Sequence, residues 1–172
     1  HDFEKSLQVA QKGLQKNARH AAFNRLVMYN NVDLKCYDEA EKAADAFFNA
    51  SDNADYSCLD YRYHGALLSA LKKYDQAIEE YGRALEKDES QVDLWREIAD
   101  AYELKNDYTQ AIAAYKKYYD SLAQDKKTSE NLFQLGRLYY GEGTSSDTLS
   151  VQSADRMAAL QAADSVFALV AE

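Results

Sequence analysis

A short pattern recurs along the chain at a nearly fixed interval. The copies that begin at residues 3, 37, 74 and 108 each carry an aromatic residue, then a small residue three positions later and a further packing residue four positions after that. Steps of three and four positions place these residues on one face of an α-helix. The copies start 34, 37 and 34 residues apart. A chain that presents the same helical face at such a period buries it against neighbouring copies, so the pattern predicts a stack of repeats.

A second amphipathic stretch precedes each copy, so each repeat is predicted to be a pair of helices. The first helix of a pair carries a small residue at an equivalent position, where a larger side chain would push the two backbones apart. These small residues are Gly65, Ala99 and Gly136. Ala77 and Ala111 on the second helices play the reciprocal part. The chain contains no proline and 6 glycines, which also indicates an all-α fold because both residues break helices.

Residues 95–115 are the clearest copy, WREIADAYELKNDYTQAIAAY. This segment resembles the tetratricopeptide repeat, whose signature runs Trp, Leu-Gly, Tyr, Ala and then Phe. The resemblance covers nearly the whole chain and implies a right-handed superhelical α-solenoid of antiparallel helix pairs. The family usually has a proline after the second helix, whereas Glu89 stands there in this sequence. The acidic, tyrosine-rich composition is similar to that of bacterial members.

The repeats predict a single domain over residues 1–172; a helical bundle is the alternative that the 34-residue recurrence disfavours. The expected order is an orphan second helix at 2–16, helix pairs at 18–50, 55–88 and 91–124, and a last pair at 128–172 with an inserted loop at about 141–151. The chain opens with His1 and not with Met. We therefore expect an internal piece of a longer protein, and a cytoplasmic and an exported location both stay open.

Charge narrows the classes of partner. The formal charge is −9 and the pI about 4.8, which disfavours nucleic acid and acidic membranes and favours proteins with basic segments. No run of 18 apolar residues occurs in the sequence, so no membrane insertion is expected.

Few residues could support catalysis or bind a metal. No two of the three histidines share a metal-ligand spacing, and His64 is predicted to be a packing residue beside Gly65. Acidic pairs such as Glu79-Glu80 are interpreted as solvated helix faces. Cys36 and Cys58 match no metal-site pattern, and two thiols or one disulfide both stay open. We expect a chain without enzymatic activity, metal or cofactor.

The resemblance implies that the inner, concave face of the first helices holds a peptide. Projection of the helices places the following residues on that face: Asn24, Arg25, Arg62, Tyr63, Arg96, Asp100, Phe133, Arg137 and Tyr140. Met28 projects to the same face. Arg62 and Arg96 are equivalent in adjacent repeats and are expected to form a ladder that binds carboxylates. The alternative is a salt-bridged surface, in which each arginine pairs with an acid on the same face.

These observations predict a non-enzymatic interaction scaffold that binds a peptide or an extended protein segment on the concave face. One alternative is a structural module that forms homo-oligomers through the ends of the solenoid. Another is a regulatory or positioning part of a larger multidomain protein.

Overall fold

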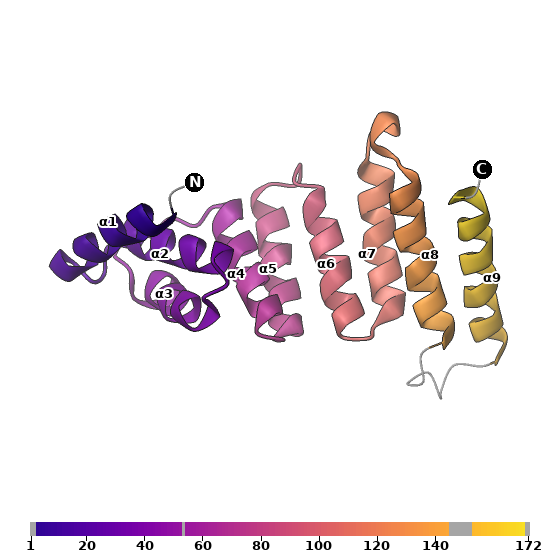
Figure 1. The fold of residues 1–172 in the computed structure, drawn as a ribbon, viewed down its shortest axis with the longest axis horizontal. Coiled ribbons are helices and arrows are strands. Elements are labelled where there is room, and N and C mark those ends of the chain that lie inside the picture. Colours follow the sequence, from indigo (N-terminus) through magenta and orange to yellow (C-terminus); the bar gives the residue numbers. More distant parts are fainter. Residues whose placement is uncertain (1–2, 53, 145–152, 171–172) are drawn as a thin grey trace. The chain divides into compact units, whose positions relative to one another are not determined.

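A computed structural model describes residues 3–52, 54–144 and 153–170 (Figure 1). These residues form nine α-helices and one 3-10 helix, with no strand among them. The helices are α1 (Phe3–Lys16), α2 (Ala21–Asp33), α3 (Tyr37–Ala50), α4 (Cys58–Ala70), α5 (Tyr74–Lys87), α6 (Asp93–Leu104), α7 (Tyr108–Ser121), η1 (Gln124–Lys126), α8 (Ser129–Thr144) and α9 (Ser153–Val170). The prediction of an all-α solenoid of helix pairs is confirmed.

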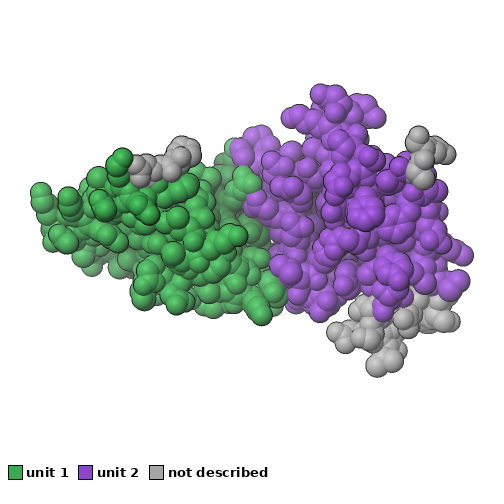
Figure 2. All heavy atoms as spheres, viewed as in Figure 1, with its two compact units in different colours: residues 1–89 green, residues 90–172 purple. Residues whose placement is uncertain are grey.

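The chain divides into two compact units, which Figure 2 shows in different colours. Unit 1 comprises residues 1–89 and unit 2 comprises residues 90–172. In unit 1, α2 packs on α3 and α4 packs on α5, while α1 packs on α2. In unit 2, α6 packs on α7 and α8 packs on α9. Within each unit, each helix thus lies beside the next one in the chain, as expected for stacked helix pairs.

Three pairs share the same turn between their first and second helices. Lys35, Lys72 and Asn106 have positive φ angles of 59°, 61° and 64°. After each of them, the next backbone N–H donates to a carbonyl five residues back: Cys36 to Asn31 at 2.8 Å, Lys73 to Leu68 at 2.8 Å and Asp107 to Tyr102 at 2.9 Å. This pattern is the Schellman motif, which satisfies carbonyls at a helix end and favours glycine or asparagine at the left-handed position.

Lysine is a poor residue for that position, so Lys72→Gly should stabilise unit 1 by up to about 1 kcal/mol. A left-handed conformation costs a non-glycine residue about 1 to 2 kcal/mol, and the freedom of glycine in the unfolded chain offsets roughly half of the gain. Urea unfolding measures the change. The control is Lys42→Gly in the interior of α3, which should destabilise by about 1 kcal/mol. If both variants changed the free energy of unfolding in the same direction, the assignment of the Schellman turn would be contradicted.

Small residues let the helices of a pair approach closely, as predicted. A Cβ atom added to Gly65 would lie 2.7 Å from the ring of Tyr81, and one added to Gly136 would lie 2.6 Å from the ring of Phe167. Ala77 and Ala111 are fully buried. The aromatic ring of the second helix therefore fills the space that a side chain on the first helix would occupy.

The doubled aromatic Phe47-Phe48 closes the joint between α3 and α4. Phe47 is fully buried in the core of unit 1. The ring of Phe48 stacks on that of Tyr56 with centroids 5.1 Å apart, and the Tyr56 hydroxyl donates to the Phe48 carbonyl at 2.9 Å. The aromatic pair thus anchors the segment that leads into α4.

An inserted loop was expected at about 141–151, but residues 141–144 are helical, because α8 continues to Thr144. Gly141 faces the ring of Tyr108, where a Cβ atom would lie 2.3 Å away. The Glu142 carboxylate accepts a hydrogen bond from the Thr109 hydroxyl at 2.7 Å. These contacts with α7 support the extra turn. The rest of the expected loop lies outside the described residues.

Candidate functional site

In unit 1 the predicted binding face is formed by α2 and α4, and it centres on a buried carboxylate. Asp60, in the first turn of α4, is fully buried. Its Oδ1 accepts a hydrogen bond from the Tyr29 hydroxyl at 2.7 Å, and Arg25 Nε lies 2.8 Å from the same oxygen. We call Arg25, Tyr29, Asp33, Asp60 and Tyr63 the α2–α4 wall.

The local sequence explains the position of Asp60. Ser57 is the N-cap of α4, and its hydroxyl accepts a hydrogen bond from the Asp60 backbone N–H at 3.3 Å. In return, Asp60 Oδ2 accepts from the Ser57 backbone N–H at 2.7 Å. This reciprocal pair is a capping box, with aspartate in place of the usual glutamate. The cap fixes the carboxylate, so it meets α2 in one orientation.

Two tyrosines continue the α2–α4 wall. The rings of Tyr29 and Tyr63 stack with centroids 4.1 Å apart, and the Tyr63 hydroxyl donates to the Asp33 carboxylate at 3.1 Å. Burial raises the pKa of Tyr29, and its hydrogen bond to Asp60 raises that pKa further. Burial and the charge of Asp33 likewise raise the pKa of Tyr63. Both phenols are therefore protonated donors at neutral pH.

Arg25 and Asn24 support the fold of unit 1. The Arg25 guanidinium donates to the Asp55 carbonyl at 2.5 Å and lies over the Phe47 ring, 5.1 Å from its centroid. The prediction that Asn24 lies on the binding face needs correction, because this residue is buried. Its amide donates to the Ala18 carbonyl at 3.0 Å and to Ser51 Oγ at 3.2 Å. Met28 is also fully buried in the core, so neither side chain is available to a partner.

In unit 2 the predicted face is formed by α6 and α8. We call Arg96, Asp100, Glu103, Phe133, Arg137 and Tyr140 the α6–α8 wall. The two Arg137 Nη groups donate to the two carboxylate oxygens of Glu103, with Nη2 2.8 Å from Oε2. Arg137 Nε donates to Gln134 Oε1 at 2.9 Å. The hydrogen bonds to Glu103 raise the pKa of Arg137 above its ordinary value. Because Glu103 lies on α6 and Arg137 on α8, this planar ion pair joins the two helices.

Large exposed side chains lie beside that ion pair. Phe133 is 44% exposed and Tyr140 is 54% exposed. Phe133 also contacts α9, because its ring centroid is 5.7 Å from that of Phe167. On α6, the Arg96 guanidinium lies over the buried Tyr118 ring, 5.8 Å from its centroid, and Asp100 is exposed one turn further along. The wall thus combines charge with accessible aromatic surface.

The two interpretations of the arginines can be compared within each unit. Arg25 and Arg137 both pair with acids of their own wall, as the salt-bridged alternative proposed. Arg62 lies on α4 in unit 1, whereas Arg96 lies on α6 in unit 2. A ladder formed by Arg62 and Arg96 would join the two units and stays a prediction.

Sequence projection missed Tyr29 and Asp60, the two residues that organise the α2–α4 wall. The capping-box spacing of Ser57 and Asp60 was a usable signal for the position of Asp60. Nothing in the helical pattern indicated that Tyr29 would donate to it, because that contact joins residues 31 positions apart.

The structure also describes the histidine and the cysteines that the sequence analysis considered as candidate sites. His64 packs beside Gly65 as predicted: its ring stacks on Phe48 with centroids 4.6 Å apart. Both cysteines are thiols, with Cys36 exposed and Cys58 half-buried. Within the described ranges, no three His, Cys, Asp or Glu side chains gather closely enough to hold a metal ion. None of the helices described is both long and apolar enough to cross a membrane.

The helix pairs and their sequence identify the class of protein. Residues 64–126 match the family model of the tetratricopeptide repeat. This match shows that residues 64–126 carry tetratricopeptide repeats, and the helix pairs have the fold of a tetratricopeptide-repeat protein. Such repeats generally mediate protein–protein interactions. A comparison with curated proteins gave no match.

Solved structures agree with this fold over nearly the whole chain. The C-terminal part of a tetratricopeptide-repeat protein from Cytophaga hutchinsonii aligns with a TM-score of 0.73 and 20% identity, over 98% of this chain and 58% of that one. A structure of MamA aligns with a TM-score of 0.69 and 17% identity, over 99% of this chain and 91% of that one. A second MamA structure gives 0.69 and 16%, over 96% and 82%. This chain therefore spans 58% of the Cytophaga structure, and at these identities the likeness concerns the fold.

Proposed function

We propose that this chain is a non-enzymatic interaction scaffold and that its α6–α8 wall binds an extended segment of a protein partner. One observation carries the proposal: Phe133 and Tyr140 are exposed on α8 on either side of Arg137, which is held by Glu103. Tyrosine and arginine are enriched among the residues that dominate binding energy at protein interfaces. An accessible aromatic–arginine–aromatic strip is therefore the part of unit 2 best suited to a partner.

The spacing of the strip suits an extended segment. Phe133 and Tyr140 are seven positions apart and so lie on one face of α8, roughly 10 Å apart along the axis. An extended strand rises about 3.3 Å per residue, so about three residues of a partner would span that distance. Apolar side chains of the partner would contact the two rings.

Arg137 has N–H donors that can bind the backbone or an acidic side chain of the partner between those rings. Its bonds to Glu103 and Gln134 engage three N–H groups of the guanidinium, and an arginine has five such donors. The bonds also fix the side chain before binding, which lowers the entropy lost in the complex. Arg96 and Asp100 on α6 extend the wall with charges of both signs.

The test uses peptides selected against the whole chain from a random library displayed on phage. Their affinities are then measured for the parent and for a Phe133→Glu/Tyr140→Glu variant. We expect the double variant to lose at least about tenfold in affinity, because two hot-spot side chains are removed and charge is added to an apolar contact. Circular dichroism confirms that both proteins keep their helices.

The matched control is Met157→Glu/Leu169→Glu on α9. These side chains are each 56% exposed, so the control introduces the same charge at equally accessible apolar positions of the same unit. Peptides that bind the parent and the control but not the first variant would support the α6–α8 wall. Equal affinity for all three proteins, or no selected peptide, would contradict the proposal.

A further inference from the structure

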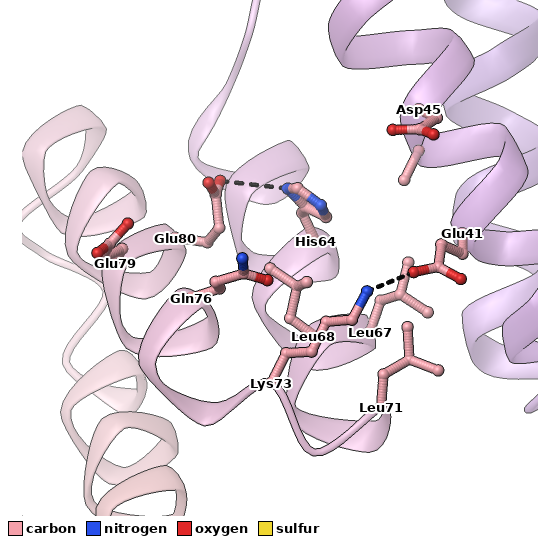
Figure 3. Close-up of a pocket in the computed structure, with 11 residues that line it drawn as sticks. Glu41, Asp45, His64, Leu67, Leu68, Leu71, Lys73, Gln76, Glu79 and Glu80 are labelled. Carbon is pink, nitrogen blue, oxygen red and sulfur yellow. Dashed lines mark hydrogen bonds and ion pairs between the residues drawn. The ribbon is translucent and has the colours of Figure 1, made fainter.

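A pocket in unit 1 shares no lining residue with either wall. It has a volume of about 290 Å³ and is lined by α3, α4 and α5, with no residue of the α2–α4 wall. Figure 3 shows Glu41 and Asp45 of α3 on one side and Glu79 and Glu80 of α5 on the other, with leucines of α4 between them. The pocket therefore lies between the second helices of two successive pairs.

The base of the pocket is apolar. Leu67 and Leu68 of α4 are buried, 1% and 8% exposed, and Leu71, the C-cap residue of that helix, is half-buried. The methylene stem of a lysine or arginine packs well on such a surface while its charged end reaches polar groups. A long basic side chain thus has a place for its apolar part.

The rim of the pocket is acidic. Four carboxylates line it, and the one lysine among its lining residues, Lys73, is held by Glu41 with Nζ 2.6 Å from Oε1. Asp45 and Glu79 are exposed. The excess of carboxylates over cationic groups favours a positively charged ligand, and the apolar base keeps part of that charge away from screening water.

One oxygen of a buried carboxylate in the lining has no hydrogen bond from the part of the chain that the structure describes. Glu80 is only 7% exposed, unlike the solvated helix face predicted from the sequence. Its Oε1 accepts a hydrogen bond from Arg83 at 2.5 Å. Its Oε2 is buried without a hydrogen-bond partner among the described residues and faces His64 Nδ1 at 3.4 Å. An acceptor left in this state costs free energy, which a donor supplied by a ligand would recover.

We propose that this pocket is a second binding site, which takes an arginine or lysine side chain of a protein partner. Arginine fits better, because its planar fork of donors can address Glu80 and a rim carboxylate at once. The partner is therefore a protein segment that presents a long basic side chain. This site is independent of the α6–α8 wall.

The probe is the peptide acetyl-Ala-Phe-Arg-Ala-amide, titrated at millimolar concentration into isotope-labelled protein and followed by NMR. We expect chemical-shift changes centred on His64, Gln76 and Glu80. The same peptide with citrulline in place of arginine keeps the shape but lacks the charge, and it should leave these signals unchanged. Spermine is titrated separately to represent a free polyamine.

Three variants locate the ligand. Glu80→Gln keeps the size of the side chain but loses its charge, and Asp45→Asn/Glu79→Gln changes only exposed rim positions. Both should weaken binding of the arginine peptide by about tenfold. Glu86→Gln, an exposed acid of α5 outside the pocket, is the matched control and should bind like the parent. The Asp45→Asn/Glu79→Gln variant changes only exposed side chains, so it still tests the pocket if Glu80→Gln disturbs the packing of α4 and α5.

Each contrary result overturns the proposal. Absent shifts in the pocket, or equal shifts with the citrulline peptide, would show that no basic side chain is recognised there. Spermine binding without arginine-peptide binding would make the ligand a free polyamine instead of a protein. Equal binding by the rim variant and the Glu86 control would place the peptide elsewhere. The Phe133→Glu/Tyr140→Glu variant should bind this peptide normally, so the two proposals fail or succeed separately.

Discussion

Asp60→Ala should lower the free energy of unfolding of unit 1 by about 3 kcal/mol. The substitution removes half of the capping box with Ser57, the acceptor for the Tyr29 hydroxyl and the counter-charge beside Arg25. All of these contacts converge on a fully buried side chain, so water cannot replace them without opening the structure. The loss should appear in urea unfolding.

A probe specific to unit 1 is needed for this measurement. The single tryptophan, Trp95, lies in unit 2, so its fluorescence follows that unit. Amide hydrogen exchange in α2 and α4 follows unit 1 instead. The control is Asp52→Ala, which removes an exposed pair with Arg19 and should cost at most about 0.5 kcal/mol. If Asp60→Ala cost no more than this control, the buried network would not stabilise the unit.

Gly65→Val should destabilise unit 1 by about 2 to 3 kcal/mol, since added atoms in a packed core cost about that much. The new Cβ atom would begin 2.7 Å from the ring of Tyr81, and this ring is 4% exposed. The ring cannot move aside without disturbing the contact between α4 and α5. The measurement is again urea unfolding with hydrogen exchange, here in α4 and α5.

Gly82→Val provides a matched control for Gly65→Val. Gly82 lies in α5 of the same unit, and a Cβ atom added there meets nothing within 4 Å. Valine has a slightly better helix propensity than glycine, so this variant should be neutral or more stable by a few tenths of a kcal/mol, roughly. A similar loss for both variants would mean that the close approach at Gly65 has no special cost.

The repeat predicted the helix pairs and their close contacts well. Spacing and side-chain size carry that information, because residues three and four positions apart must share a helical face. Gly65, Gly136 and Ala77 could thereby be placed at helix–helix contacts from the repeat pattern alone. The Schellman turns, in contrast, were not predicted, because two of the three left-handed positions carry lysine, which gives no signal for a positive φ.

The surfaces were predicted less well than the core, because the partners of long polar side chains depend on contacts between distant segments. Asn24 was projected onto the binding face, but Ser51, 27 positions away, approaches and accepts its hydrogen bond. Glu80 was predicted to be solvated, but it is buried between α4 and α5 beside His64. Helical periodicity indicates which side of a helix a residue lies on and does not indicate what covers it.

The buried carboxylate of Asp60 also bears on how unit 1 unfolds. The residue belongs to α4, yet it receives a hydrogen bond from Tyr29 of α2, so this contact belongs to neither helix pair alone. In repeat proteins, stability is a sum of the intrinsic stability of each repeat and a coupling term between neighbours. Unfolding of either helix pair would leave the Asp60 carboxylate without part of its buried contacts, and this cost adds to the coupling between the two pairs. The two helix pairs of unit 1 should therefore melt as one cooperative block, without a populated state in which only one of them is folded.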